Sequence, residues 1–402
     1  MEQNIKTQLL TKKPIELLFQ LSIPAVIGMT VIGLYPLMDG VFAGNIIGQT
    51  AMTACGVATT LTIFNNGVAT LVGIGSASVL SRALGKGDQE TVDKIMGNLI
   101  YWVIWFSAII TIGGILFAPH FLSMVGATGE IKSYGIRYLK IIFLGSIFVN
   151  FTQSANMVMR GEGLMKKAMM IMGFGALLNI ILDPILMIIM GDYAIEGAAI
   201  VTAQFVQAIV TLHYFLKKSK TVKIQRIKSN AVIKKEMFGI GSSAMMMNLL
   251  FMIQQTMLYK MAFQYGGDPN GILMSAAMRI YGFSFIPLWG MSQGLQPVVG
   301  TNFGAKLFNR VRETVKVFSI GGLILAAIFW IPAILFSKLI LYWFGVEADI
   351  IVQDVGNFRL FYSVFVLYGV MVMSITFFQS IGNGKKLELL LCSGNFSYSF
   401  LQ

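Results

Sequence analysis

The 402-residue sequence is strongly apolar, with 56% hydrophobic residues, only 12% charged residues and a formal net charge of +12. A soluble fold with so few charged residues could not cover its surface, because soluble domains carry about 25% charged residues. Apolar stretches long enough to cross a hydrocarbon core of about 30 Å recur along the chain. This composition excludes a soluble globular protein and predicts an all-α polytopic membrane protein.

Ten apolar stretches are predicted membrane spans. They are residues 14–38, 52–80, 95–118, 133–158, 165–190, 195–216, 237–265, 271–302, 315–341 and 355–381. An eleventh stretch begins near Leu387. The first stretch is too long for a signal peptide and lacks a cleavage site with small residues, which indicates a retained helix.

Lysine and arginine are distributed unevenly over the connections between these spans. They gather in the N-terminus and in the even-numbered connections, above all in the basic segment 217–235, whereas the odd-numbered connections hold only Lys132 and Lys338. Because cytoplasmic loops carry the excess of basic residues, the N-terminus is predicted to be cytoplasmic. The positive net charge then belongs to the inner membrane face, so the lipid bilayer and not nucleic acid is the expected partner.

Glycine landmarks recur in the two halves of the chain in the same order. At a spacing of 219, Gly85 and Gly126 correspond to Gly304 and Gly345, and at a spacing of 221, Gly135, Gly161 and Gly163 correspond to Gly356, Gly382 and Gly384. Six spans per copy return the chain to its starting side, so the copies are expected to be related by an axis along the membrane normal. This predicts a two-lobe bundle with an N-lobe at 1–216, a basic cytoplasmic linker at 217–235 and a C-lobe at 236–402.

The second copy is expected to be shorter than the first. The same spacing would place the end of a twelfth helix beyond Gln402, and the last stretch, "CSGNFSYSFLQ", is polar where its counterpart, "GFGALLNIILD", is apolar. The expectation is therefore a 6+6 parallel repeat with a truncated second lobe. About 10 to 11 transmembrane helices would be present, with helix 11 partial and helix 12 absent.

Two carboxylates stand out because they lie inside apolar segments, Asp39 and Asp183. An ionised carboxylate in a bilayer is costly, so such residues usually face a cavity, pair with another group or take up a proton. Asn179 lies four residues before Asp183, on the same helical face. Clustered oxygen ligands suit a proton or a hard cation such as sodium. The alternatives are a solvated turn at Asp39, before Gly40, and a helix cap at Asp183, before a proline.

Other polar and flexible side chains are candidates for a central substrate cavity. They are Gln153, Asn156, Met246, Gln254, Gln255 and Arg279. The amides could instead bridge helices, and methionine is also a common filler of apolar gaps. Pro24 lies inside the first span and removes a helical hydrogen bond, which favours a bend there.

Signals for enzymatic catalysis are weak. "GMSQG" at 290–294 matches the G-x-S-x-G pattern, but it lies in an apolar helix with no strand before it. The sequence contains neither a P-loop nor an H-E-x-x-H motif, and Cys55 and Cys392 have no paired spacing. The protein is predicted not to be an enzyme and to need no cofactor, so transport would have to use an ion gradient.

Several stretches together resemble one family of transporters. They are "SIPAVIGMTVIGLYPLMDGVFAG" in the first span, "RGEG" at 160–163, "NIILDP" at 179–184, "GAAIVTAQ" at 197–204 and "GMSQGLQPVVGTNFGA" at 290–305. In these stretches the chain resembles the multidrug and toxic compound extrusion (MATE) transporters, and within them the bacterial DinF/MepA-like branch. The resemblance implies a secondary active antiporter that exports cationic or amphipathic compounds in exchange for protons or sodium by alternating access.

The resemblance also implies a particular ion site in the N-lobe, which could hold a sodium ion. It carries over to Asp39, Asn179, Asp183 and Thr202, and Pro24 matches a proline linked to helix bending. Some family members have acids in helices 7 and 10 instead. Gln254 and Gln255 stand in helix 7 of this chain, so that second site is not supported.

The family implies a multi-pass protein of the bacterial cytoplasmic (inner) membrane. It is expected to be a monomer that binds small cationic drugs or dyes. Two alternatives remain open at this point. One is a flippase for lipid-linked oligosaccharides from the same superfamily, which would be expected to have a more basic cavity. The other is a truncated fragment that does not transport.

Overall fold

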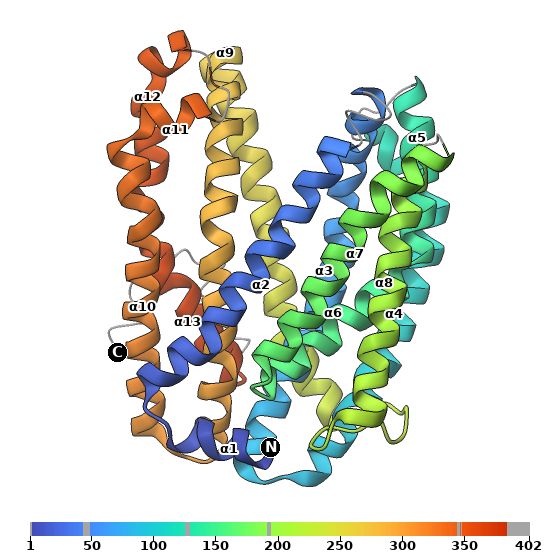
Figure 1. The fold of residues 1–402 in the computed structure, drawn as a ribbon, viewed down its shortest axis with the longest axis vertical. Coiled ribbons are helices and arrows are strands. Elements are labelled where there is room, and N and C mark those ends of the chain that lie inside the picture. Colours follow the sequence, from blue (N-terminus) through green and yellow to red (C-terminus); the bar gives the residue numbers. More distant parts are fainter. Residues whose placement is uncertain are drawn as a thin grey trace.

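The computed structural model describes residues 2–42, 49–124, 129–190, 194–343, 346 and 348–383. In these ranges the chain is helical and contains no strand, as the sequence predicts (Figure 1). Asp39, Gln255 and Arg279 lie in helical backbone, but their side chains fall outside the described part of the structure.

The helices follow one another through short connections. They are α1 (Glu2–Thr11), α2 (Pro14–Phe42), α3 (Gln49–Lys86), α4 (Gln89–Met124), α5 (Gly129–Leu144), α6 (Ser146–Gly161), α7 (Met165–Met190), α8 (Ala194–His213), η2 (Tyr214–Lys218), α9 (Ala231–Gly304), α10 (Phe308–Leu335), α11 (Ser337–Trp343), α12 (Ala348–Ser363), η3 (Val364–Leu367) and α13 (Tyr368–Ser380). Among the described residues, seven helical segments are long and apolar enough to cross a membrane, and a bent pair supplies an eighth. Large apolar side chains such as Ile112 and Leu116 are exposed on these helices, as expected for a surface that faces lipid.

Helix α9 contains two predicted spans, 237–265 and 271–302, in one continuous stretch of helical backbone. A straight helix of 74 residues would be about 110 Å long at 1.5 Å per residue. However, Met237 and Thr301 contact Gly75 and Gly85, which are only ten positions apart on α3. Helix α9 therefore doubles back on itself, and Figure 1 shows its yellow arm rising and its orange arm descending. The two arms of α9 correspond to the two predicted spans, and the connection expected between them is helical.

The predicted span 133–158 consists of two helices, α5 and α6, which meet at an angle of 53°. The break falls at Gly145, where an added Cβ would overlap the side chain of Val201 on α8. Thr111 Oγ1 donates a hydrogen bond of 2.7 Å to Phe143 O, a carbonyl next to the break. The predicted span is therefore bent, because the close approach of α8 and this side-chain donor favour a bend.

Two groups of helices diverge from a common end, which is the end that carries α1 (Figure 1). Their contact at this end repeats itself between the two halves of the chain. An added Cβ on Gly85 would overlap Thr301 O, and one on Gly304 would overlap Arg82 O. Because Arg82 and Thr301 are themselves 219 positions apart, each half makes the same contact with the other. This is the geometry expected of two copies related by a twofold axis.

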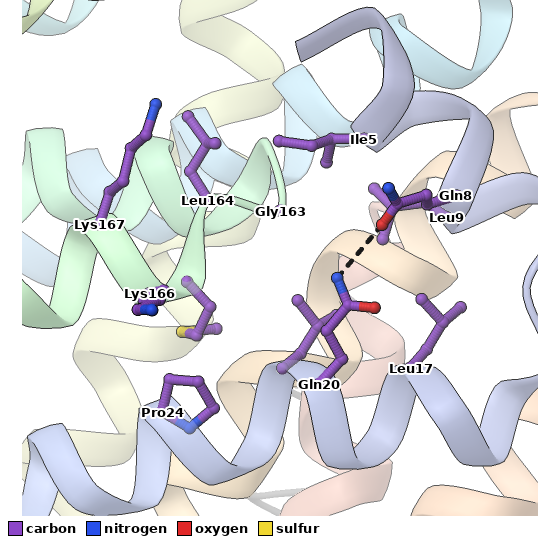
Figure 2. Close-up of a pocket in the computed structure, with 12 residues that line it drawn as sticks. Ile5, Gln8, Leu9, Leu17, Gln20, Pro24, Gly163, Leu164, Lys166 and Lys167 are labelled. Atoms are coloured by element: carbon purple, nitrogen blue, oxygen red, sulfur yellow. Dashed lines mark hydrogen bonds between the residues drawn. The ribbon is translucent and has the colours of Figure 1, made fainter. Parts of the chain in front are cut away.

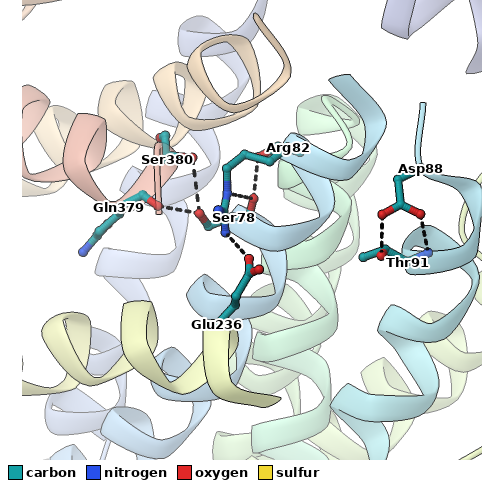
Figure 3. A network of polar contacts seen from close by, with 8 residues as sticks. Ser78, Arg82, Asp88, Thr91, Glu236, Gln379 and Ser380 are labelled. Atoms are coloured by element: carbon teal, nitrogen blue, oxygen red, sulfur yellow. Dashed lines mark hydrogen bonds and ion pairs between the residues drawn. The ribbon is translucent and has the colours of Figure 1, made fainter. Parts of the chain in front are cut away.

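Polar contacts close the same end of the molecule (Figure 3). Arg82 on α3 forms a salt bridge of 3.0 Å with Glu236 on α9 and donates from Nε to Ser78 O at 3.2 Å. Ser78 Oγ donates to the carbonyl oxygens of Gln379 and Ser380 at the end of α13. Helices from both halves are thus joined at the end where the basic connections lie. We call this group of contacts the basic-end closure.

Helix α1 lies across this end and is attached to the second half of the chain. Asn302 Nδ2 donates to Leu9 O at 2.9 Å, and the guanidinium of Arg310 donates to Lys12 O. Nearby, Asp88 caps α4 by accepting from Thr91 N and Thr91 Oγ1. These two hydrogen bonds hold the pKa of Asp88 below its usual range, because they stabilise the ionised carboxylate.

Candidate functional site

A small polar cavity lies within the first half of the chain, between α2, α6, α7 and α8. Its volume is about 60 Å³, and its lining residues are Ile32, Thr152, Gln153, Met172, Gly175, Ala176, Asn179, Ile200, Gln204 and Gln207. A cavity of this size has room for a few water molecules or one cation, but not for a drug-sized molecule. We call it the polar cavity.

Asn179 and Asp183 lie one turn apart on α7, as their spacing predicts. Asn179 Nδ2 donates to Asp183 Oδ1 at 3.2 Å, and Asp183 has no solvent exposure. Asn179 lines the polar cavity, and its Oδ1 is buried without a hydrogen-bond donor among the described residues. Since burying an acceptor without a donor is costly, this oxygen favours a proton donor, a water or a cation inside the cavity.

Helix α8 supplies amides to the polar cavity at positions that the sequence analysis did not select. Ile200, Gln204 and Gln207 line it, and their spacing of four and three residues places them on one helical face. Gln204 Oε1 is buried and also lacks a donor among the described residues, while Gln207 Nε2 donates to Ile171 O at 3.1 Å. This spacing alone could have revealed the face.

Thr202 does not join this group. It is exposed and absent from the lining of the polar cavity, because two residues along a helix turn the side chain to nearly the opposite side. The role of Thr202 stays a prediction from the family resemblance, and in the described structure Gln204 occupies the face of α8 that lines the polar cavity. Asp39 cannot be placed, since its side chain lies outside the described part.

A second, larger cavity lies between the two halves of the chain. It has a volume of about 430 Å³, which is within the range of small-molecule sites, and it is lined by Met29, Thr70, Ile74, Met157, Ala244, Met247, Asn248, Leu250, Gln254, Tyr281, Phe285, Ile286, Trp289, Gln293, Tyr368, Met371, Val372 and Ile375. These residues come from α2, α3, α6, α9 and α13. Asn248 Nδ2 donates to Thr70 Oγ1 at 3.3 Å and links the two halves there. We call it the interlobe cavity.

Aromatic rings form a ladder along one wall of the interlobe cavity. Tyr281, Phe285 and Trp289 are each one turn apart on α9, with stacked rings whose centroids are separated by 5.7 Å and 6.2 Å. Tyr368 on α13 approaches Tyr281 edge-on at 5.5 Å. All four rings line the cavity. None of the described lining residues is charged, so aromatic faces and thioethers dominate its chemistry.

The predicted cavity residues fall into three groups. Gln254 lines the interlobe cavity, and Gln153 lines the polar cavity, where its Nε2 donates to Asn66 Oδ1 at 3.2 Å. Two further predicted residues lie outside both linings. Met246 lines neither cavity, and its neighbour Met247 lines the interlobe cavity instead, because consecutive helical residues point about 100° apart.

Asn156 is the other predicted cavity residue that lines neither cavity. It is buried, and its Nδ2 donates to Ala168 O on α7 at 2.7 Å. This amide joins α6 to α7, which is the helix-bridging alternative. Gln255 and Arg279 remain unassigned because their side chains are not described. Pro24 lies in α2 and borders neither the polar nor the interlobe cavity, but a third cavity at the basic end.

The fold and cavities define a class: a polytopic helical membrane protein with a repeated architecture and a drug-sized cavity between its halves. The family model for MatE matches residues 24–185 and 243–394, one segment in each half. The chain belongs to the MATE family of transporters.

Relatives with known names agree with this family. The chain is 29% identical over 327 residues to the multidrug export protein MepA of Staphylococcus aureus strain NCTC 8325 / PS 47, covering 77% of this chain and 70% of MepA. A MepA from strain MSSA476 is 26% identical over 396 residues, covering 94% of this chain and 84% of that protein.

Solved structures show the same fold. A multidrug resistance MATE family transporter of the MOP superfamily, solved in an outward-facing conformation, superposes with a TM-score of 0.89 at 25% identity, covering 95% of this chain and 86% of that one. A MOP superfamily transporter from Pyrococcus furiosus gives the same TM-score and coverage at 26% identity, and its binding pocket is described as having reverse polarity that suggests a different function.

Proposed function

We propose that the protein is a secondary active multidrug efflux antiporter. It exports cationic or amphipathic aromatic compounds in exchange for protons or sodium, by alternating access between its two lobes. The observation that carries the proposal is the pair of separate cavities. One is small and polar, and Asn179 in its lining donates to the buried carboxylate of Asp183. The other is larger and mostly apolar, and stacked aromatic rings line it.

The polar cavity is the proposed coupling site. Asp183 is buried within α7 and accepts a hydrogen bond from Asn179. Desolvation disfavours an ionised carboxylate, so uptake of a proton or binding of a cation stabilises it there. The amide oxygens of Asn179 and Gln204 supply further ligands of the kind that hard cations prefer. Asp39, on the neighbouring α2, is proposed as a second carboxylate of this site because it matches an acid of the ion site that the family resemblance implies.

The interlobe cavity is the proposed substrate site. Flat aromatic compounds can stack on the rings of Phe285 and Trp289, and a positive charge on them is attracted by the faces of the same rings. The flexible thioethers of Met29, Met157, Met247 and Met371 adapt to ligands of different shape. The described lining residues include no carboxylate, and this chemistry supports recognition of aromatic cations without one.

The orientation of the chain supports export to the outside. The basic connections are proposed to lie in the cytoplasm, so the basic-end closure would seal the cytoplasmic side of the interlobe cavity. The helices diverge toward the opposite end (Figure 1), which supports an outward-facing state. Opening the basic-end closure would then be required for the substrate to enter from the cytoplasm.

Transport of ethidium by the purified full chain in liposomes tests the proposal. An imposed pH gradient or sodium gradient should drive ethidium against its concentration gradient, as followed by fluorescence. Loss of the Trp289 ring in Trp289→Leu should raise the half-saturating ethidium concentration about fivefold or more, since stacking and cation–π contacts contribute about 1 kcal/mol.

Trp105→Leu is the matched control, because Trp105 is exposed on α4, away from the interlobe cavity. It should leave the half-saturating concentration unchanged. If neither gradient drives ethidium, the antiporter assignment is wrong. If Trp105→Leu and Trp289→Leu have equal effects, the interlobe cavity is not the substrate site.

A further inference from the structure

A third cavity lies at the basic end, between α1, α2 and the start of α7 (Figure 2). Its volume is about 280 Å³, comparable with the smaller small-molecule sites. It lies away from the aromatic ladder and shares no lining residue with either the polar or the interlobe cavity. We call it the α1 cavity.

The floor of the α1 cavity is aliphatic. Leu9 from α1, Leu17 and Leu21 from α2, and Leu164 and Met165 from the start of α7 all line it, and these five side chains are buried. Gly163, which precedes α7, also lines the cavity. A lining of this kind suits a hydrocarbon chain and offers no strong partner to a polar metabolite.

The rim of the α1 cavity is polar and positively charged. On one side, Lys12 Nζ donates to Gln20 Oε1 at 2.8 Å, and Gln20 Nε2 donates to Gln8 Oε1 at 3.2 Å. On the other side lie Lys166 and Lys167. The ammonium of Lys167 lies over the ring of Tyr214, 5.3 Å from its centroid, and in Figure 2 it points away from Pro24. Lys166 is exposed and forms no salt bridge within the described part of the chain.

We propose that the α1 cavity binds one anionic phospholipid of the membrane leaflet at the basic end. Part of an acyl chain fills the aliphatic floor, and the phosphate lies at the rim between Lys166 and Lys12. The acyl chain gains little by leaving the bilayer, because the bilayer core is as apolar as the cavity. Selectivity therefore comes from the headgroup, and basic pockets between helices on the cytoplasmic side suit anionic lipids.

Occupancy of this cavity bears on the position of α2. Pro24 lines the α1 cavity, and a proline inside a helix leaves a carbonyl without its helical donor and weakens the helix locally. An acyl chain packed between Leu9, Leu21 and Leu164 would hold α1 against α2 and α7 on the basic-end side of this weak point. The bound lipid is thus placed to favour one position of α2 over another.

The test counts lipids bound to the purified full chain by native mass spectrometry. Delipidated protein is titrated with phosphatidylglycerol or with phosphatidylcholine of the same acyl chains. One phosphatidylglycerol should bind with at least tenfold higher affinity than phosphatidylcholine. Lys12→Gln combined with Lys166→Gln should reduce phosphatidylglycerol affinity about thirtyfold, as expected for two lysines at an anionic surface.

Two further variants and a competitor complete the design. Arg312→Gln with Lys316→Gln removes the same charge from α10 at two positions that do not line the α1 cavity, and should leave the affinity unchanged. Ile5→Trp should fill the cavity and abolish the first binding event without removing any charge. Inorganic phosphate, added as a competitor, should displace no phosphatidylglycerol.

Three results would overturn the proposal. They are equal affinity for the two lipids, equal losses in the two charge-removing pairs, and displacement of the lipid by inorganic phosphate, which would assign the rim to a free anion. The melting temperature of each variant is measured in the same detergent. If the lysine pair fails to fold, Ile5→Trp alone decides, because unchanged lipid binding in that variant contradicts occupancy of the cavity.

Discussion

At the scale of single residues, the polar cavity depends on how α7 and α8 present their oxygen atoms. Asn179 donates from Nδ2 to Asp183, and its Oδ1 accepts no hydrogen bond from the described residues. Gln204 Oε1 is in the same situation on α8. Both residues line the polar cavity, and Asn179 also bonds the buried carboxylate. Two buried acceptors of this kind are better satisfied when a proton donor, water or cation is present.

Replacement of Gln204 tests this arrangement on α8. Gln204→Leu keeps the approximate volume of the side chain but removes the oxygen ligand. The half-saturating concentration of the coupling ion should rise about tenfold, corresponding to about 1.4 kcal/mol for one lost polar contact to a charged group. The measurement is the initial rate of ethidium transport as a function of proton or sodium concentration.

Thr202→Val is the control on the same helix, because Thr202 is exposed and does not line the polar cavity. Its half-saturating concentration should equal that of the unmodified protein. A large effect of Thr202→Val with none of Gln204→Leu would restore the site implied by the family resemblance and contradict the described geometry.

The sequence predicts part of this site for physical reasons. Asp183 stands out because a carboxylate inside an apolar span is rare and costly, and Asn179 follows from helical spacing alone. Gln204 could have been found from its spacing with Ile200 and Gln207. The orientation of Met246, Met247 and Asn156 could not, because the rotation of a helix inside an apolar bundle depends on packing and leaves little trace in the hydrophobic pattern.

At the scale of helices, the basic-end closure relies on close approach between α3 and α9. Gly85 and Gly304 leave no room for a methyl group, since an added Cβ would overlap a backbone oxygen of the opposite helix. The salt bridge between Arg82 and Glu236 adds less, because the Glu236 side chain is 48% exposed and such pairs contribute about 0–1 kcal/mol. Backbone packing is therefore the main element of the closure.

Gly304→Ala should open this closure. Overpacking at a tight contact costs about 1–3 kcal/mol, which would shift the population away from the closed basic end. Hydrogen exchange, followed by mass spectrometry, should become faster in the peptides covering 78–86 and 296–304. Gly113→Ala on α4 is the control, because nothing lies within 4 Å of an added Cβ there, and unchanged exchange in both variants would contradict the packing argument.

Helix ends and breaks show where the sequence is informative at this scale. The existence of the spans follows from apolar length, and the N-cap of α9 at Asn230, which accepts from Val232 N and Ile233 N, has a recognisable residue type. The break at Gly145 cannot be predicted from apolar length or residue type, because it depends on the contact with Val201 of α8. The hydrophobic pattern also does not predict that the backbone stays helical through the turn of α9.

At the scale of the whole molecule, the duplication seen in the glycine landmarks becomes a physical contact. Gly85 and Gly304 meet the opposite halves at equivalent positions. The two copies predicted from the sequence therefore contact each other symmetrically at the basic-end closure. The two cavities are less symmetrical. The buried acid lies in the first half, whereas the aromatic ladder lies on α9 and α13 of the second half.

The charges exchanged in the proposed antiport determine which part of an ion gradient drives it. If one proton enters for each monovalent cation that leaves, no net charge crosses the membrane and the voltage makes no contribution. Each unit of pH difference then supplies about 1.36 kcal/mol. Under these conditions, the proposed coupling would require Asp183 to alternate between protonated and ionised forms.

The most direct measurement of the central claim is ethidium transport driven by a pH gradient or sodium gradient in liposomes containing Asp183→Asn. The substitution preserves shape and removes the charge that a proton or sodium ion must neutralise. We expect gradient-driven accumulation to fall to the level of protein-free liposomes, while ethidium binding remains within about twofold, the scatter typical of a neutral substitution. Gradient-driven transport that continues at the unmodified rate would contradict the assignment of Asp183 as the coupling residue.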